Sequence, residues 1–271
     1  MADYLKIEIP VTDAQVKDQL LAVLSLMDFE GFEETDTAVL AYQEQDKFEE
    51  AELKMIIDQF GLTYSVSTEP QQNWNALWES NFDPVVVEDF CAIRAHFHEP
   101  IASAKHEILI TPKMSFGTGH HATTYLMVKE MSQVDFDGKV VADFGTGTGI
   151  LAILAEKLGA KEVVAIDYDE WSIENTKENV ENNGCSAIAV LKLDHFGVSQ
   201  KFDIILANIN KNVILDNLAG LANGLASGGL LLLSGLLKSD ETEVIAACEA
   251  KGLKWKHTNE RNNWITIMLS Y

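Results

Sequence analysis

The stretch "ADFGTGTGILAI", residues 142–153, places a glycine at every second position directly after a short apolar run. Glycine costs roughly 0.5–1 kcal/mol relative to alanine in regular structure, so three glycines together need a geometric reason. In an open α/β sheet a ligand binds beyond the carboxyl ends of the strands, near the first turn from strand to helix. We therefore predict that residues 145–149 form this turn, and that the missing side chains make room for a cofactor at the start of the next helix.

The chain around this turn alternates between strands and helices from residue 139 onward. The expected strands are almost wholly apolar, as parallel strands buried on both faces must be; they cover residues 139–144, 162–168, 187–193, 202–208 and 228–236. The expected helices lie between them, which predicts a doubly wound, Rossmann-like α/β sheet. Residues 253–271 are typical of two strands joined by a polar turn, so we expect an antiparallel hairpin at one edge.

The preceding segments have other patterns. Residues 4–69 have the order strand, helix, strand, strand, helix, strand, which predicts a small ferredoxin-like α+β domain. We place its boundary at residue 70, followed by a linker helix over 71–84 and the large domain over 85–271. Within the large domain, residues 85–97 and 107–112 are two extended runs that come before the strand and helix alternation.

The composition restricts the partners. Lys and Arg number 20 and Asp and Glu 42, which gives a formal net charge of −22. A direct nucleic-acid partner is disfavoured, because binding to nucleic acid requires a basic surface. A cationic protein, in contrast, would be attracted. It stays open whether the acidic residues serve solubility alone. Cys91, Cys185 and Cys248 lack metal-ligand spacing and are expected to be ordinary buried thiols in a reducing compartment. The first ten residues carry charge and a proline, and no apolar run spans a bilayer, so we expect a cytoplasmic protein without a membrane segment.

The spacing of the glycines narrows the choice of cofactor. In a dinucleotide fingerprint the third glycine would fall on Ile150, and a phosphate-binding loop would need a Lys followed by Ser or Thr. The pattern from Asp143 to Gly149 instead resembles motif I of the class I methyltransferases that use S-adenosyl-L-methionine. A structural turn without a ligand and a nucleotide-binding turn remain alternatives at this point.

Polar residues at the ends of the later strands extend the candidate site. Asp167 ends the next strand, where doubly wound folds place an acid against a ribose diol. Asp169 lies beyond the strand and is expected to cap the following helix. Asp194 is either a contact of the adenine amino group or an ordinary loop carboxylate. Asn208 ends the fourth strand, beside the position to which a reactive methyl group would project.

Four segments in this order resemble the ribosomal protein L11 methyltransferase family: "SFGTGHHATT" (115–124), "DFGTGTGILAI" (143–153), "AIDYD" (165–169) and "ANI" (207–209). The resemblance implies a seven-stranded class I methyltransferase domain that uses S-adenosyl-L-methionine. It implies cofactor contacts at Thr124, Gly145, Gly147, Asp167 and Asn208. It also implies methylation of the N-terminal α-amine and lysine amines of large-subunit ribosomal protein L11. The chain departs from the family pattern at His120 and Ala122, where the family has Thr and Pro.

The chemistry expected from this resemblance is a direct attack of a neutral amine on the sulfonium methyl group, for which positioning dominates. Deprotonating a lysine of pKa about 10.4 at pH 7 costs roughly 4.6 kcal/mol, against about 1.4 for an α-amine. We expect no dedicated base, and we assign to Asn208 the catalytic role of accepting an amine N–H. His120 and His121 are not expected to bind a metal. Thr123 and Thr124 could also be a simple helix cap.

Two other functions fit the sequence. One is a class I methyltransferase that acts on another protein or on a small-molecule amine. The other is a nucleotide-binding or scaffold protein without catalytic activity.

Overall fold

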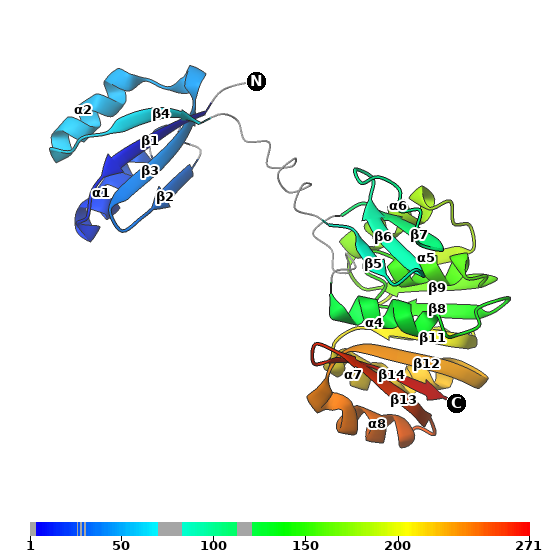
Figure 1. The fold of residues 1–271 in the computed structure, drawn as a ribbon. Helices are drawn as coiled ribbons and strands as arrows, with labels where there is room; N and C mark the ends of the chain where they lie inside the picture. The colour runs from blue at the N-terminus through cyan, green and yellow to red at the C-terminus, as the bar shows by residue number, and fades with distance from the viewer. Residues whose placement is uncertain (1–3, 26, 28, 30, 70–82, 113–120) are drawn as a thin grey trace. The chain divides into compact units, whose positions relative to one another are not determined.

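The computed structural model describes residues 4–25, 27, 29, 31–69, 83–112 and 121–271. The chain divides into two compact units, Met1–Phe82 and Asp83–Tyr271, and each is described here by itself (Figure 1). The expected linker helix over 71–84 and most of the loop 115–124, including His120, fall outside the described residues. The predicted domain boundaries at 70 and 84 stay predictions.

The first unit is a four-stranded antiparallel sheet in the order β2-β3-β1-β4 with two helices. Its elements are β1 (Tyr4–Pro10), α1 (Ala14–Leu24), β2 (Gly31–Glu34), β3 (Ala38–Glu44), a 3-10 turn (Gln45–Lys47), α2 (Glu50–Phe60) and β4 (Ser65–Glu69). Asp13 caps α1 by accepting from the backbone N–H groups of Gln15 and Val16. Apolar residues of β1, β3 and both helices form a common core. The predicted ferredoxin-like arrangement is therefore confirmed.

The second unit contains a seven-stranded sheet in the order β10-β9-β8-β11-β12-β14-β13. Its strands are β8 (Val140–Phe144), β9 (Glu162–Asp167), β10 (Ile188–Lys192), β11 (Phe202–Asn208), β12 (Leu225–Leu237), β13 (Lys254–Arg261) and β14 (Trp264–Ser270). The first five run parallel to one another, and β14 runs antiparallel to both β12 and β13. The doubly wound sheet and the terminal hairpin are both confirmed. The strand order reverses between β8 and β11, which defines the switch point of the sheet.

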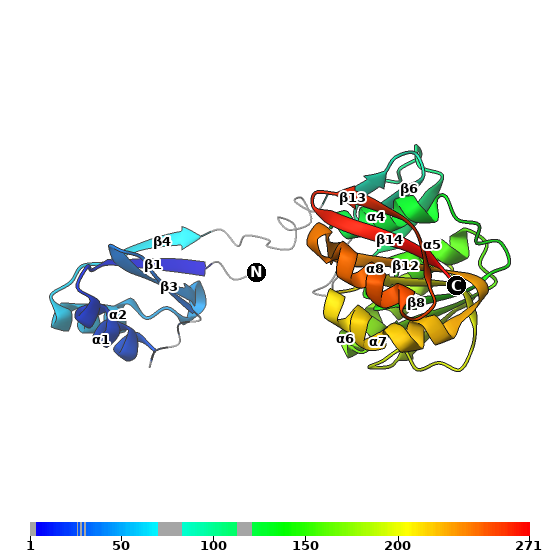
Figure 2. The ribbon, with the colours of Figure 1, turned by 90° about the horizontal axis from the view of Figure 1, so that it is seen from below.

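Helices cover both faces of this sheet (Figure 2). They are α4 (Ala122–Met131), α5 (Ile150–Lys157), α6 (Glu170–Asn182), α7 (Lys211–Gly224) and α8 (Glu241–Glu249). The helices α4 and α5 pack together on one face, and α7 and α8 pack together on the other. Ile204, Ile205 and Leu206 of the central strand β11 are at most 2% exposed. This two-sided burial explains why the strands are apolar throughout.

The segment 85–97 differs from the expected single extended run. It forms a hairpin of β5 (Val85–Val87) and β6 (Cys91–Ala95), and β7 (His106–Ile110) adds a parallel third strand. The chain reverses at Glu88, which has a left-handed φ of +52°. The Glu88 carboxylate accepts from the Lys129 ammonium of α4 at 2.7 Å, so an ion pair accompanies the turn.

The free edge of β7 is closed by asparagine side chains of α6 instead of by another strand. Asn183, which directly follows α6, accepts from the Leu109 N–H at 3.0 Å and donates to the Leu109 carbonyl at 2.6 Å. Asn179 accepts from the Thr111 N–H at 2.8 Å, and Asn175 donates to the Thr111 carbonyl at 3.1 Å. These side chains, four residues apart on one face of the helix, supply the backbone partners that a neighbouring strand would supply.

Candidate functional site

The glycine loop lies at the switch point, where the carboxyl ends of β8, β9 and β11 meet. The backbone N–H groups of Gly145 and Thr146 both donate to the Ile166 carbonyl of β9, at 2.8 and 3.0 Å. Gly145, Gly147 and Gly149 have φ values of +75°, +57° and +85°. Only glycine adopts this left-handed region without strain, so the backbone path itself requires the three glycines.

Two of the glycines also have neighbours that leave no space for a side chain. A Cβ at Gly145 would lie 2.1 Å from Cγ2 of Ile209, and one at Gly149 would lie 3.0 Å from Cγ2 of Thr176. The contact with Ile209 is a further reason for glycine at position 145, beside the predicted room for a cofactor. A contact between the loop backbone and a cofactor stays a prediction.

The helix α6 fixes the loop from the opposite side. Thr176 donates to the Gly147 carbonyl and Asn179 donates to the Thr148 carbonyl, both at 2.8 Å. The Asn179 amide nitrogen therefore binds the glycine loop, while its amide oxygen binds Thr111, the residue after β7. Sequence reasoning missed this face of α6, although its polar residues at intervals of three and four carry a visible periodic signal.

Asp167 is the last residue of β9 and is 7% exposed. One carboxylate oxygen accepts from the Gly147 N–H at 2.9 Å, and the other accepts from the Asp169 N–H at 3.1 Å. Asp169 in turn caps α6 by accepting from the Ser172 N–H at 2.9 Å, which confirms its predicted role. Asp194 is exposed and lies 2.5 Å from Nδ1 of His195, and its predicted contact with adenine stays a prediction.

Asp143 supports the loop from inside the protein. It is 1% exposed, and one of its carboxylate oxygens accepts from the Thr146 hydroxyl at 2.6 Å and the Ala152 N–H at 3.2 Å. Its other oxygen has no hydrogen-bond partner among the described residues. Burial raises the pKa of Asp143 to about 7, and the nearby charge of Asp167 acts in the same direction.

Asn208 and Thr124 come together although they are 84 residues apart. The Asn208 amide nitrogen lies 3.5 Å from the Thr124 hydroxyl oxygen. Asn208 ends β11, and Thr124 is a buried residue in the first turn of α4. The fold thus gathers the five predicted site residues around the switch point, with Asp167 against Gly147 and Asn208 against Thr124.

The start of α4 is capped by His121 rather than by the threonines. The His121 Nδ1 lies 2.8 Å from the Thr123 hydroxyl and accepts from the Thr123 N–H at 3.4 Å. Thr123 and Thr124 are inside the helix and 3% exposed, so the alternative that they are the cap is wrong. Within the described ranges no group of three or more His, Cys, Asp or Glu residues is placed to hold a metal ion.

The helix α4 is fastened to the terminal hairpin at three positions. The His121 ring packs edge-on against Trp264 at 4.5 Å between centroids, and the Arg261 guanidinium lies 3.5 Å above the Tyr125 ring. Near the end of the helix, the buried carboxylate of Glu130 accepts from His257 at 2.8 Å and from Asn259. These contacts fix the helix that carries Thr124.

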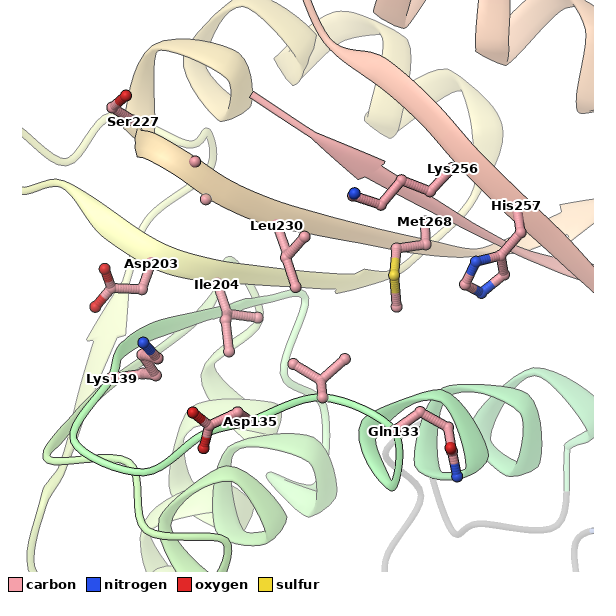
Figure 3. A pocket seen from close by; sticks show the side chains of 13 residues that line it. Gln133, Asp135, Lys139, Asp203, Ile204, Ser227, Leu230, Lys256, His257 and Met268 are labelled. Carbon is pink, nitrogen blue, oxygen red and sulfur yellow. The ribbon is translucent and has the colours of Figure 1, made fainter.

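A cavity of about 530 Å³ lies at the opposite end of the sheet (Figure 3). Its lining includes Lys139, which precedes β8, and Asp203, near the start of β11. The cavity therefore opens at the amino ends of the strands. Lys139 and Lys256 are balanced by Asp135 and Asp203, so the lining favours no sign of ligand charge. This cavity is separate from the candidate site.

Two of the three cysteines are buried as expected. Burial raises the pKa of the Cys91 and Cys248 thiols to about 12, which is typical of unreactive structural cysteines. The expectation is wrong for Cys185, which is only partly buried, although burial raises the pKa of its thiol to about 11. No helix in the described part of the chain is long and apolar enough to span a membrane.

Comparison with known proteins gives consistent results. Residues 6–271 match the family model described as ribosomal protein L11 methyltransferase (PrmA). Proteins with the name ribosomal protein L11 methyltransferase from Porphyromonas gingivalis and Bacteroides fragilis are 41% and 38% identical to this chain. The matches cover 92% and 95% of this chain and 89% and 95% of those proteins. A crystal structure of ribosomal protein L11 methylase from Lactobacillus delbrueckii subsp. bulgaricus superposes with a TM-score of 0.65 and 30% identity, covering 69% of this chain and 97% of that one.

Proposed function

The chain belongs to the ribosomal protein L11 methyltransferase family and is thus a protein methyltransferase, and from this premise we propose its cofactor, its substrate and its site. The cofactor is S-adenosyl-L-methionine. The substrate is large-subunit ribosomal protein L11, at its N-terminal α-amine and lysine amines. The observation that supports the site is the meeting of Thr124, Asp167 and Asn208 with the glycine loop at one end of the sheet.

The residues at the switch point fit this cofactor. The N-cap of α5, Gly149, has no side chain to accept from the first turn, and Asp143 accepts only the Ala152 N–H there, so the N–H groups of Ile150 and Leu151 would face the carboxylate of the methionine part. Each Asp167 oxygen accepts one backbone N–H and keeps a lone pair for a ribose hydroxyl. Gly145 and Gly147 would contribute backbone groups, and Thr124 would close the side of the site formed by α4.

The residues of this chain act by orientation. When bound, the cofactor would supply an activated methyl group, so that no residue of the protein would have to protonate a leaving group. The Asn208 amide oxygen accepts an N–H of the neutral substrate amine and directs the lone pair toward the methyl group. The Thr124 hydroxyl, 3.5 Å from the Asn208 amide nitrogen, holds the amide in the orientation that presents its oxygen to the amine. The amine gives its proton to water before the attack, and the N-terminal α-amine does so at the lower cost.

The function is tested by incubating the full-length protein with purified ribosomal protein L11 and S-adenosyl-L-methionine and measuring the mass of the product. We expect mass increases in multiples of a methyl group at the N-terminus and at lysines. Methylation of small amines with no methylation of the protein would favour a small-molecule enzyme. Calorimetry that detects no binding of S-adenosyl-L-methionine would favour a scaffold protein.

The role of the first unit is also part of this proposal. We assign residues 1–70 to recognition of the protein substrate, because the residues of the site described above all come from the second unit. We further propose that the enzyme acts without direct contact to nucleic acid and without a membrane partner, in the cytoplasm.

A further inference from the structure

The strand β12 contains a β-bulge beside Asn208, the residue to which the mechanism assigns the orientation of the amine. β12 lies between β11 and β14 in the sheet (Figure 1). Its register with β14 shifts toward its carboxyl end, so that Ser234 and Gly235 together stand opposite the single residue Thr266. Gly235 has a left-handed φ of +82°. Bulges bend a strand and change the direction of nearby side chains, and they are frequent next to active sites.

The missing side chain of Gly235 makes room for the backbone of Ile209. A Cβ at position 235 would lie 2.1 Å from the Ile209 carbonyl oxygen, 2.7 Å from its carbonyl carbon and 2.9 Å from its nitrogen. These are backbone atoms, which cannot turn aside as the end of a flexible side chain can. Any side chain at position 235 would therefore push away the residue that directly follows Asn208.

Hydrogen bonds hold the bulge and Ile209 together. The Ile209 N–H donates to the Ser234 carbonyl at 3.1 Å, and Asn208 is the partner of Ser234 in the register of β11 and β12. Ser234 is 0% exposed; its hydroxyl donates to the Ile265 carbonyl at 2.8 Å and accepts from the Thr266 hydroxyl at 3.2 Å. The bulge is thus fixed to β14 on one side and holds the Ile209 backbone on the other.

The side chain of Ile209 is held by the glycine loop. Its Cγ2 occupies the space that a Cβ at Gly145 would need. Ile209 therefore lies between two glycines from different parts of the sheet, with its side chain against Gly145 and its backbone against Gly235. The position of Asn208, one residue earlier, depends on both contacts.

We propose that Gly235 is a positioning residue for the methyl transfer. With Ser234 it forms a seat for the Ile209 backbone, and this seat sets the direction of the Asn208 side chain. The inference rests on the proposed function, since it concerns the orientation of the substrate amine by Asn208. Gly235 acts through the backbone next to Asn208 and needs no contact with substrate or cofactor. Where a reaction depends on orientation, a displacement of about 1 Å can lower its rate about a hundredfold.

The test compares two glycines of the same strand in the full-length enzyme. Gly235→Ala should lower kcat for methylation of ribosomal protein L11 about tenfold or more, and change its KM and the Kd for S-adenosyl-L-methionine less than about twofold. Gly228→Ala is the matched control, because Gly228 of β12 has a similar left-handed φ of +76° but no atom within 4 Å of the added Cβ. It carries the same backbone strain without the clash, so its kcat should stay unchanged.

A double mutant shows whether Gly235 acts through Asn208. In an enzyme that already carries Asn208→Ala, adding Gly235→Ala should cause little further loss of kcat, since the side chain that Gly235 positions is gone. Two losses that multiply would show a general structural effect of Gly235 and overturn the inference. An unchanged kcat in Gly235→Ala, or an equal loss in Gly228→Ala, would also overturn it.

Ser234→Ala tests the seat without a new side chain at position 235, and it serves if Gly235→Ala does not fold. It removes the hydroxyl that fixes the bulge to β14. We expect kcat to fall about two- to fivefold with an unchanged KM, because the seat loosens without being displaced. An unchanged kcat in a folded Ser234→Ala variant would count against the seat.

A measurement without turnover separates this inference from the proposed function. The side-chain amide signal of Asn208 is assigned in proton–nitrogen NMR spectra by its disappearance in Asn208→Ala. It should shift in Gly235→Ala and keep its position in Gly228→Ala. If the signal shifts in this way but the wild type does not methylate ribosomal protein L11, the proposed function fails and the seat stands. If the wild type methylates the protein and the signal does not shift in Gly235→Ala, the seat fails and the function stands.

Discussion

Single residues at the switch point have separable roles. In the proposed site Asn208 and Thr124 would orient the reacting amine and Asp167 would hold a ribose, whereas Gly145 and Asp143 shape the loop. Position along a strand predicts that Asp167 and Asn208 lie at one edge of the sheet, because the carboxyl ends of parallel strands meet there. Thr124, in α4, was expected from the family resemblance alone. Strand position does not predict that Gly145 packs against Ile209, because the two residues follow different strands, β8 and β11, whose ends meet only in the folded sheet.

Asn208 provides the direct test of the mechanism. Replacing it with Ala removes the group that orients the amine, so turnover should fall about tenfold or more while the affinity for the cofactor changes little. Steady-state kinetics and calorimetry measure the two quantities. Asn223→Ala, at an exposed position near the end of α7, serves as the control. Unchanged turnover would remove Asn208 from the mechanism.

Gly145 tests the packing of the loop. In Gly145→Ala the new Cβ meets Ile209 at 2.1 Å in a left-handed backbone, and we expect a loss of stability of about 2–4 kcal/mol from strain and overpacking. Gly252→Ala, with φ of +86° and open space, should show the backbone strain alone, about 1 kcal/mol. Urea unfolding of both variants gives the comparison.

A double mutant identifies the cause of this loss. Ile209→Ala removes the methyl group that the new Cβ would meet, so combining it with Gly145→Ala should cost less than the sum of the two changes. Strict additivity of the two free energies would show that the contact with Ile209 is not what requires glycine.

Asp143 makes stability depend on pH in a defined direction. Its pKa is raised by burial to about 7, above the ordinary value of an aspartate, so the folded state favours the neutral form. The contribution to stability is present below pH about 4 and is lost as the pH rises toward 7. Asp143→Asn cannot ionise, so its Tm should increase relative to the wild type between pH 5 and pH 8. A difference in Tm that stays constant over this range would contradict the assignment.

At the scale of elements, α6 connects the end of β7 to the glycine loop. One face of this helix pairs with Thr111, the residue that follows β7, and with the carbonyls of the glycine loop. The alternation of strands and helices was predictable because burial on two faces and the helical period both leave a mark in the sequence. The pairing of α6 with β7 was not, because the partners are about 70 residues apart and involve backbone groups that every residue carries.

Asn179 tests this joint. Asn179→Leu has a similar volume but leaves the Thr111 N–H and the Thr148 carbonyl without their partner, at about 1–3 kcal/mol for each group. We expect lower stability and, because the loop loosens, a weaker affinity for S-adenosyl-L-methionine. Glu181→Leu changes an exposed residue of the same helix and should have little effect. Equal effects of the two variants on cofactor affinity would exclude the joint.

At the scale of the whole molecule, the charge of −22 governs encounters with partners. A strongly acidic enzyme attracts a lysine-bearing protein and is repelled by RNA, so the net charge connects the composition to the proposed substrate. The composition alone predicted this preference.

The choice between free and assembled substrate tests this charge effect. We expect methylation of free ribosomal protein L11 to be faster than methylation of intact ribosomes. We also expect the KM for the free protein to rise with salt, since surface charges are screened beyond about 10 Å at 0.1 M. Rates with both substrates at several salt concentrations provide the measurement. Equal or faster methylation of ribosomes at low salt would contradict the expectation.

Asn183, which pairs with Leu109 of β7, also has a consequence for the chemical ageing of the protein. Asn183 precedes Gly184, and an asparagine followed by glycine is prone to deamidation, in which the next backbone nitrogen attacks the side-chain amide and ammonia is lost. Here both reacting groups are engaged, because the Asn183 amide donates to the carbonyls of Leu109 and Asn179 while the Gly184 N–H donates to Glu181 at 2.9 Å. Deamidation at this position requires the end of the helix to open first, so the accumulated aspartate records how often stored enzyme has opened there.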